Sequence, residues 1–164
     1  MTKDELTTQS PEDIRLQKCR SSLIASGGAM MLFALWTVLR TIVQIDAQVS
    51  YRGNSEALRP MVTAIYAVCV IDLILKLYVG MSARVEGMGR EKKRPYFVLG
   101  IIIIILSLFS IEYMILEFPA SVKIYGLLVP IITMAVDVTA LYAALDLVIS
   151  AVRVRKLEQE MGRA

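Results

Sequence analysis

The sequence predicts an all-α integral membrane protein, a four-helix bundle with short connectors and with both chain termini in the cytoplasm (N-in/C-in). Three observations lead to this prediction: an apolar composition, four long apolar stretches, and a very uneven distribution of lysine and arginine. Of the 164 residues, 56% are hydrophobic and 20% are charged, and the mean hydropathy is +0.60. A soluble domain has about 45–50% apolar and about 25% charged residues, so an ordinary soluble core does not absorb this excess.

The four apolar stretches cover residues about 23–45, 60–82, 95–118 and 127–152. Each has the roughly 20 residues that a helix needs to cross about 30 Å of hydrocarbon. Each should be helical, because backbone N–H and C=O groups find no partner in lipid. The first stretch exceeds the apolar region of a signal peptide, so we expect it to be a retained span. We expect Pro119 to end the third span.

Two tails flank the transmembrane domain of residues 22–152. Residues 1–21 are predicted to form a cytoplasmic tail with a short helix from about residue 11, because Ser10 can cap a helix that Pro11 starts. Residues 153–164 are predicted to form a basic cytoplasmic tail.

The orientation follows from the positive charges beside the spans. The N-terminal tail, the middle connector and the C-terminal tail hold thirteen of the 18 lysines and arginines, whereas the first and third connectors hold three. The positive-inside rule therefore places both termini and the middle connector in the cytoplasm. We interpret the basic middle connector as an orientation signal beside anionic lipid rather than as a docking site for an acidic partner, and we expect no nucleic-acid partner.

Several classes of chemistry are disfavoured by composition. Histidine is absent, which excludes His-ligated haem, His-containing metal sites and Ser/His or Cys/His catalysis. The two cysteines, Cys19 and Cys69, are far apart and form no CxxC pair. We therefore expect no metal and no cofactor. We also expect no enzymatic activity, because an intramembrane aspartic protease would need more than a bare pair such as Asp72 and Asp137, and no GxGD motif is present.

Small residues predict where helices approach each other closely. The cluster Ser26-Gly27-Gly28-Ala29 lies in the first span, and Ala140, Ala143 and Ala144 lie in the fourth. Small side chains let two helix backbones come into contact inside a membrane.

Six ionisable side chains fall within the predicted spans, and each would cost about 2.5–3.5 kcal/mol if it stood alone at the bilayer centre. They are Arg40, Asp72, Lys76, Glu112, Asp137 and Asp146. They must face one another, a partner subunit or water. Depths counted from the span ends predict two interhelical ion pairs, Arg40 with Glu112 and Lys76 with Asp146. Asp72, four residues before Lys76, is a competing partner for the lysine.

Asp72 and Asp137 are then left near the midplane without a cation, which makes them the candidate ion or proton site. Asp137 and Asp146 are nine residues apart, about 180° around a helix. One of these two should therefore face away from the bundle, which predicts a homo-oligomer or a membrane-protein partner.

Two functions remain open. The first is a small oligomeric channel or transporter that moves a cation, a proton or a small cationic solute past the midplane acids. The alternative is a non-catalytic membrane subunit, an anchor or scaffold whose intramembrane charges contact a partner protein. The topology fits a bacterial inner membrane or a plasma membrane.

Overall fold

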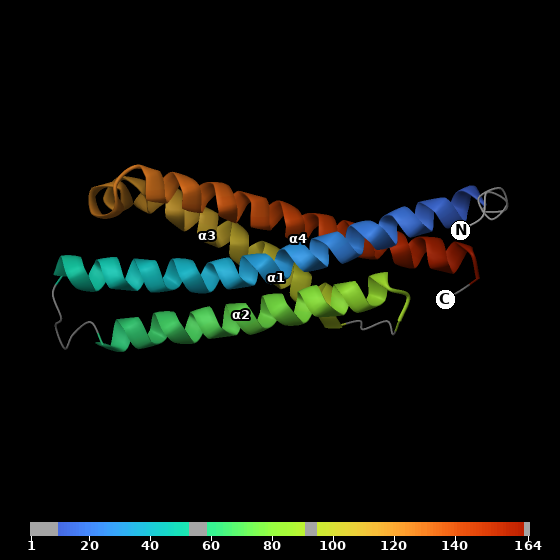
Figure 1. The fold of residues 1–164 in the computed structure, drawn as a ribbon, viewed down its shortest axis with the longest axis horizontal. Coiled ribbons are helices and arrows are strands. Elements are labelled where there is room, and N and C mark those ends of the chain that lie inside the picture. Colours follow the sequence, from blue (N-terminus) through green and yellow to red (C-terminus); the bar gives the residue numbers. More distant parts are fainter. Residues whose placement is uncertain (1–9, 53–58, 91–94, 163–164) are drawn as a thin grey trace, which may run out of the picture.

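The computed structural model describes residues 10–52, 59–90 and 95–162, and within these ranges the chain forms four helices (Figure 1). They are α1 (Pro11–Arg52), α2 (Arg59–Gly87), α3 (Pro95–Tyr125) and α4 (Leu128–Glu160). Each is long and apolar enough to cross a membrane. The predicted all-α four-helix fold is confirmed, and the protein is a multi-pass integral membrane protein. Parts of both tails and of the middle connector, residues 1–9, 91–94 and 163–164, lie outside the described residues.

The helices run beyond the predicted spans at several ends. Ser10 caps α1, where its Oγ accepts a 3.2 Å hydrogen bond from the Asp13 N–H. From Pro11 the helix continues without a break to Arg52, so the expected short helix and the first span are one element. The prediction that Pro119 ends the third span is wrong, because α3 continues through it to Tyr125. A single proline removes one backbone hydrogen bond, and a long membrane helix tolerates that loss.

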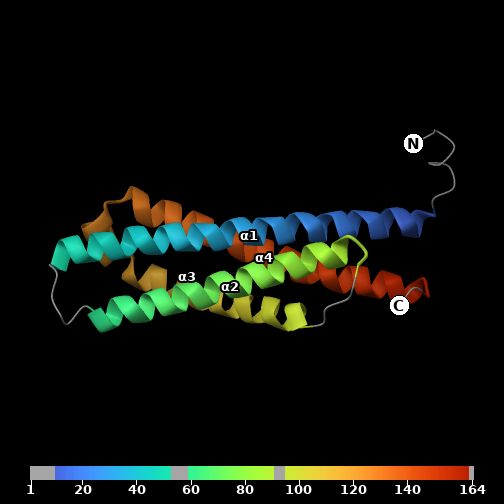
Figure 2. The same ribbon diagram turned by 60° about the horizontal axis from the view of Figure 1, so that its bottom comes forward.

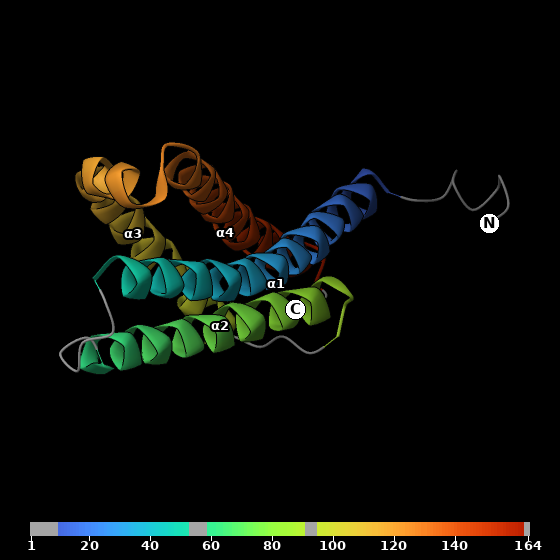
Figure 3. The same ribbon diagram turned by 60° about the vertical axis from the view of Figure 1, so that its left-hand side comes forward.

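The four helices form two antiparallel hairpins, α1–α2 and α3–α4. The start of α1, the end of α2, the start of α3 and the end of α4 lie at one end of the bundle (Figures 1 and 2). We call this end the basic end and the opposite one the distal end. The two hairpins pack together near the basic end and diverge toward the distal end (Figure 3). Helix α4 also crosses α1, passing from one side of it to the other (Figures 1 and 2).

A glycine contact holds α1 against α2, as the small-residue cluster predicts. A Cβ atom on Gly27 would lie 2.7 Å from the Gly80 carbonyl oxygen, and one on Gly80 would lie 2.6 Å from the Gly27 oxygen. Such distances are below normal contact, so the two backbones meet only because neither residue has a side chain. Gly28, the next residue, faces open space.

The closely packed core lies in the basic half of the bundle. It contains fully buried side chains from all four helices, among them Leu23, Val79, Tyr96, Leu147 and Val154. Ala143 and Ala144 of α4 are buried as predicted. Side chains therefore fill the space between the four helices in this half, and a solute cavity inside the bundle has to lie farther toward the distal end.

Labelling tests the orientation, which remains a prediction from the positive charges. Met88 and Leu127 are exposed residues in the turns after α2 and α3, at the basic and distal ends. With Cys19 and Cys69 replaced by serine, Leu127→Cys should react with an impermeant thiol reagent added to intact cells, whereas Met88→Cys should not. Reaction at Met88 alone would invert the orientation.

The glycine contact predicts opposite effects at adjacent positions. Gly27→Ala should lower the free energy of unfolding by about 1–3 kcal/mol, because its Cβ overpacks the contact with Gly80. Gly28→Ala should have no cost and can add up to about 1 kcal/mol, because alanine favours a helix. Reversible unfolding in mixed micelles measures both values. Equal values for the two variants would contradict the described contact.

Candidate functional site

A cavity of about 650 Å³ lies among all four helices, where the two hairpins diverge. Its apolar lining includes Ile65, Val68, Leu106 and Phe109. Its polar lining comprises Thr37, Arg40, Thr41, Gln44, Asp72, Lys76, Ser107, Ser110, Tyr113 and Asp137. A mostly apolar cavity with a few polar groups that converge on it is the usual form of a small-molecule site.

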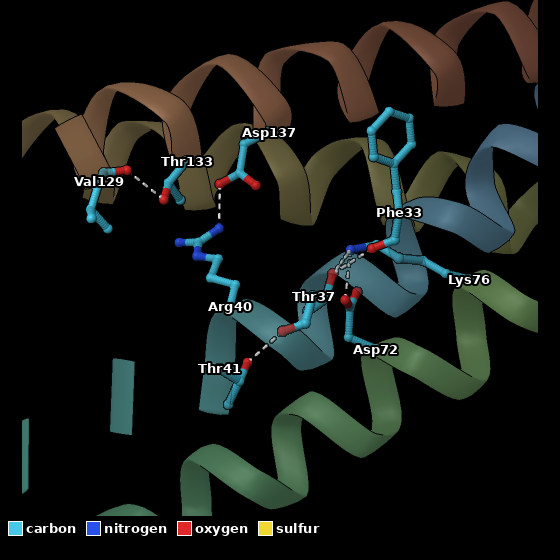
Figure 4. Close-up of polar contacts among 9 residues, drawn as sticks. All are labelled: Phe33, Thr37, Arg40, Thr41, Asp72, Lys76, Val129, Thr133 and Asp137. Carbon is cyan, nitrogen blue, oxygen red and sulfur yellow. Dashed lines mark hydrogen bonds and ion pairs between the residues drawn. The ribbon is translucent and has the colours of Figure 1, made fainter. Parts of the chain in front are cut away.

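The first ion pair of this cavity joins the two hairpins. Arg40 of α1 places its Nη1 atom 2.5 Å from Oδ2 of Asp137 on α4 (Figure 4). The side chains are only 20% and 16% exposed. Since their attraction is little screened in this setting, the pair is a strong link across the distal half of the bundle.

The second ion pair lies on α2 and also contacts α1. Lys76 Nζ is 2.6 Å from Oδ2 of Asp72, one helical turn back, and donates a 3.0 Å hydrogen bond to Oγ1 of Thr37 (Figure 4). Thr37 donates its own hydroxyl proton to the Phe33 carbonyl oxygen, so its lone pairs are free to accept from the lysine. The cavity thus holds two cations and two carboxylates and has no net charge.

These contacts differ from the pairs predicted from depth. Arg40 lies beside Asp137 and not Glu112, and Lys76 pairs with Asp72 and not Asp146. The prediction that Asp72 and Asp137 lack cations is therefore wrong, although both acids do line one cavity.

The physical reason is that depth sets the level of a side chain but not its face. Glu112 is two residues from both Ser110, which lines the cavity, and Met114, which is buried. Two residues correspond to about 200° around a helix, so Glu112 points away from the bundle and is exposed.

Asp146 is bound by hydroxyl groups. Its Oδ2 accepts hydrogen bonds from Ser22, at 3.0 Å, and from Ser26, both on α1. Ser150 of α4 donates to Ser22 at 3.2 Å. Asp137 and Asp146 therefore both contact α1, and the prediction that one of them faces outside the bundle is wrong. The crossing of α4 over α1 and the length of the Arg40 side chain bring both acids to the same helix.

Two further ion pairs close the basic end, and sequence reasoning missed them. Arg155 of α4 binds both carboxylate oxygens of Glu86 on α2, at 3.0 and 3.1 Å, and lies over the Tyr96 and Phe97 rings. Arg20 of α1 binds Glu158 at 2.7 Å. A sequence pattern that could have indicated these pairs is the helical spacing of α4. Along it, the buried stripe that includes Leu147 and Ala151 continues past residue 152 through Val154 and Glu158.

Neither a metal ligand set nor a relative identifies the site. Within residues 10–52, 59–90 and 95–162, no group of three or more His, Cys, Asp or Glu side chains is placed to hold a metal ion. No known protein family, curated protein or solved structure matches the chain. The function therefore has to be argued from the chemistry of the site itself.

Double variants test the observed pairing. Arg40→Gln leaves the Asp137 carboxylate without its cation, so it should lower the free energy of unfolding by up to about 3 kcal/mol. Arg40→Gln with Asp137→Asn should recover most of this loss, as unfolding in mixed micelles would show. Glu112→Gln is the control, and it should be neutral or stabilising because it removes an exposed acid from the membrane span. If stability lost in Arg40→Gln were instead recovered by adding Glu112→Gln and not by adding Asp137→Asn, Arg40 would pair with Glu112, as depth predicts.

Proposed function

We propose that the protein is a transporter that binds a small amphiphilic solute in the cavity between the two hairpins. The observation that carries the proposal is a cavity of about 650 Å³ with two ion pairs in its wall. It lies on the distal side of the basic half, whose interior is filled by the apolar core. Intramembrane ionisable groups that line a cavity are the usual mark of a substrate or ion pathway.

A transporter fits this arrangement better than an open channel. The Arg40–Asp137 pair spans the gap between α1 and α4, and the core around Leu23, Tyr96 and Leu147 fills the basic half. The Arg155–Glu86 and Arg20–Glu158 pairs add a second barrier at the basic end. A solute that enters from the distal side can proceed only if the hairpins change their packing, as alternating access requires.

The charge balance of the cavity points to a solute that carries both signs. A lone cation bound at Asp72 or Asp137 would leave the cations Lys76 and Arg40 in excess, at a high cost in low dielectric. A zwitterion exchanges partners without changing the net charge, because its ammonium group takes a carboxylate while its anionic group takes Arg40 or Lys76. Asp72 and Asp137 thus keep their proposed role as cation-binding groups.

The rest of the lining suits the apolar part of such a solute. Phe109 and Tyr113 of α3 provide aromatic faces to an ammonium group, and Ile65, Val68 and Leu106 provide apolar surface. When a solute takes Asp137 away from Arg40, the distal link between the hairpins is released. Partner exchange at this pair therefore couples binding to movement of the helices.

Glu112 supports the alternative, a subunit of a larger membrane complex. It is an exposed carboxylate within the membrane-spanning part of α3, beside the exposed Tyr113. A charge in this position is costly against lipid and is relieved by a partner protein. This alternative requires no solute and predicts that Glu112, rather than the cavity, carries the function.

Three probes of similar shape separate these hypotheses: phenylalanine (zwitterion), phenethylamine (cation) and 3-phenylpropionate (anion). We expect purified protein to bind phenylalanine most tightly and reconstituted vesicles to take it up. Arg40→Gln and Asp137→Asn should each weaken binding at least about tenfold, the effect of losing one charge-assisted contact. Equilibrium binding and vesicle uptake measure the two effects.

Glu112→Gln is the control and should bind phenylalanine like the wild type. Preference for phenethylamine would restore the simpler hypothesis of a cationic solute. The transport proposal fails if wild-type vesicles take up none of the probes and pass no proton, sodium or potassium ions. A membrane protein that copurifies with the wild type but not with Glu112→Gln would then support the alternative, a subunit of a larger membrane complex.

A further inference from the structure

A second cavity, of about 320 Å³, lies at the basic end between the first turns of α1 and the last turns of α4. Four cationic side chains line it, Arg15 and Lys18 from α1 and Arg153 and Lys156 from α4, together with Glu160. It is separate from the solute cavity, with which it shares no lining residue. An inference about it therefore stands independently of the proposed function.

The arrangement of α4 explains why these cations converge. On one face of its last turns, Arg155 binds Glu86 and Glu158 binds Arg20. Arg153 and Lys156 lie on the other face, toward Arg15 and Lys18. The ion pairs that close the bundle thus use one face of α4 and leave the other to bring positive charges together.

The charges around this cavity are poorly neutralised by the protein itself. The Nζ atom of Lys156 lies 4.0 Å from Oε1 of Glu160, and both side chains are largely exposed, at 75% and 58%. A pair of this kind contributes little. Among the residues that the structure describes, Arg15, Lys18 and Arg153 form no ion pair. Since like charges that share a cavity repel one another, an anion bound there would stabilise the contact between α1 and α4.

The position of the cavity indicates which anion. Two of its lining residues, Cys19 and Leu157, pack against the apolar core, and the cavity lies just outside the predicted span limits at residues 23 and 152. Ile14 and Val152, next in sequence to two of the cations, are about half exposed apolar side chains. Cations beside apolar surface at the membrane boundary match the headgroup and upper acyl chain of a phospholipid.

We propose that this cavity binds the phosphate group of an anionic phospholipid, such as phosphatidylglycerol, in the leaflet at the basic end. The phosphate accepts hydrogen bonds from arginine and lysine of both helices and removes the repulsion between them. The acyl chains remain in the bilayer and hold the headgroup at the cavity at high local concentration. A free phosphate ion offers the same charge without this anchor.

The test measures thermal unfolding of the full-length protein in non-ionic micelles during titration with short-chain lipids. Phosphatidylglycerol should raise the unfolding temperature at concentrations where phosphatidylcholine and inorganic phosphate do not. Arg153→Gln with Lys156→Gln should weaken the apparent affinity for phosphatidylglycerol about 25-fold, roughly fivefold for each charge near a membrane surface.

Arg90→Gln with Lys123→Gln is the matched control, because it removes two exposed cations that do not line the cavity. It should leave the affinity within about twofold of the wild type. An equal loss in both double variants would mean diffuse attraction and overturn the site. Equal stabilisation by inorganic phosphate would assign the cavity to a free anion, and no selectivity for phosphatidylglycerol over phosphatidylcholine would also refute the proposal.

Discussion

The structure depends on one constraint: ionisable side chains within the membrane spans need partners, because hydrocarbon provides none. Helix α1 supplies most of these partners. Its Arg40 binds Asp137, its Thr37 supports the Lys76–Asp72 pair, and its serines bind Asp146. Gly27 also brings the α1 backbone against Gly80 of α2, so α1 contacts both α2 and α4. The other helices are therefore positioned around α1, and α3 enters the bundle mainly through its packing on α4.

The two halves of the bundle satisfy the constraint differently. In the basic half, close apolar packing is combined with carboxylates that are buried and fixed, such as Glu86 against Arg155. In the distal half, ion pairs line a cavity and have space beside them. A packed core has few alternative arrangements, whereas an ion pair beside a cavity can exchange partners with a solute of matching charges. This difference is the reason for proposing that a solute binds in the distal half, while the packed basic half contributes most to stability.

The sequence was sufficient for the class of fold and for part of the packing. Four membrane-length apolar stretches and the small residues around Gly27 specify helices and a close contact, because length and side-chain size act locally. The partners of the charges were not predictable in the same way. Counting residues gave Arg40 and Glu112 the same depth, but the face of α3 depends on how that helix packs, which turns Glu112 outward. Asp137 and Asp146 are on opposite faces of an isolated helix, yet both reach α1 because α4 crosses it. Crossing angles and helix rotation arise from tertiary packing, and the positions and lengths of the four apolar stretches do not determine them.

The polar contacts between α1 and α4 described above lie at three levels, and their chemistry differs from level to level. Arg40–Asp137 is an ion pair in the distal half, the Asp146–serine contact lies in the middle, and Arg20–Glu158 lies at the basic end. The middle contact uses three short hydroxyl side chains, and hydroxyl protons rotate to follow an acceptor. If α4 keeps this contact while Asp137 leaves Arg40, the distal half of α4 can turn about the serines. The Arg20–Glu158 pair holds the two helices together on the other side of this pivot. The cavity that gathers cations from both helices lies at that end, so the anion proposed to bind there would act on the angle between α1 and α4.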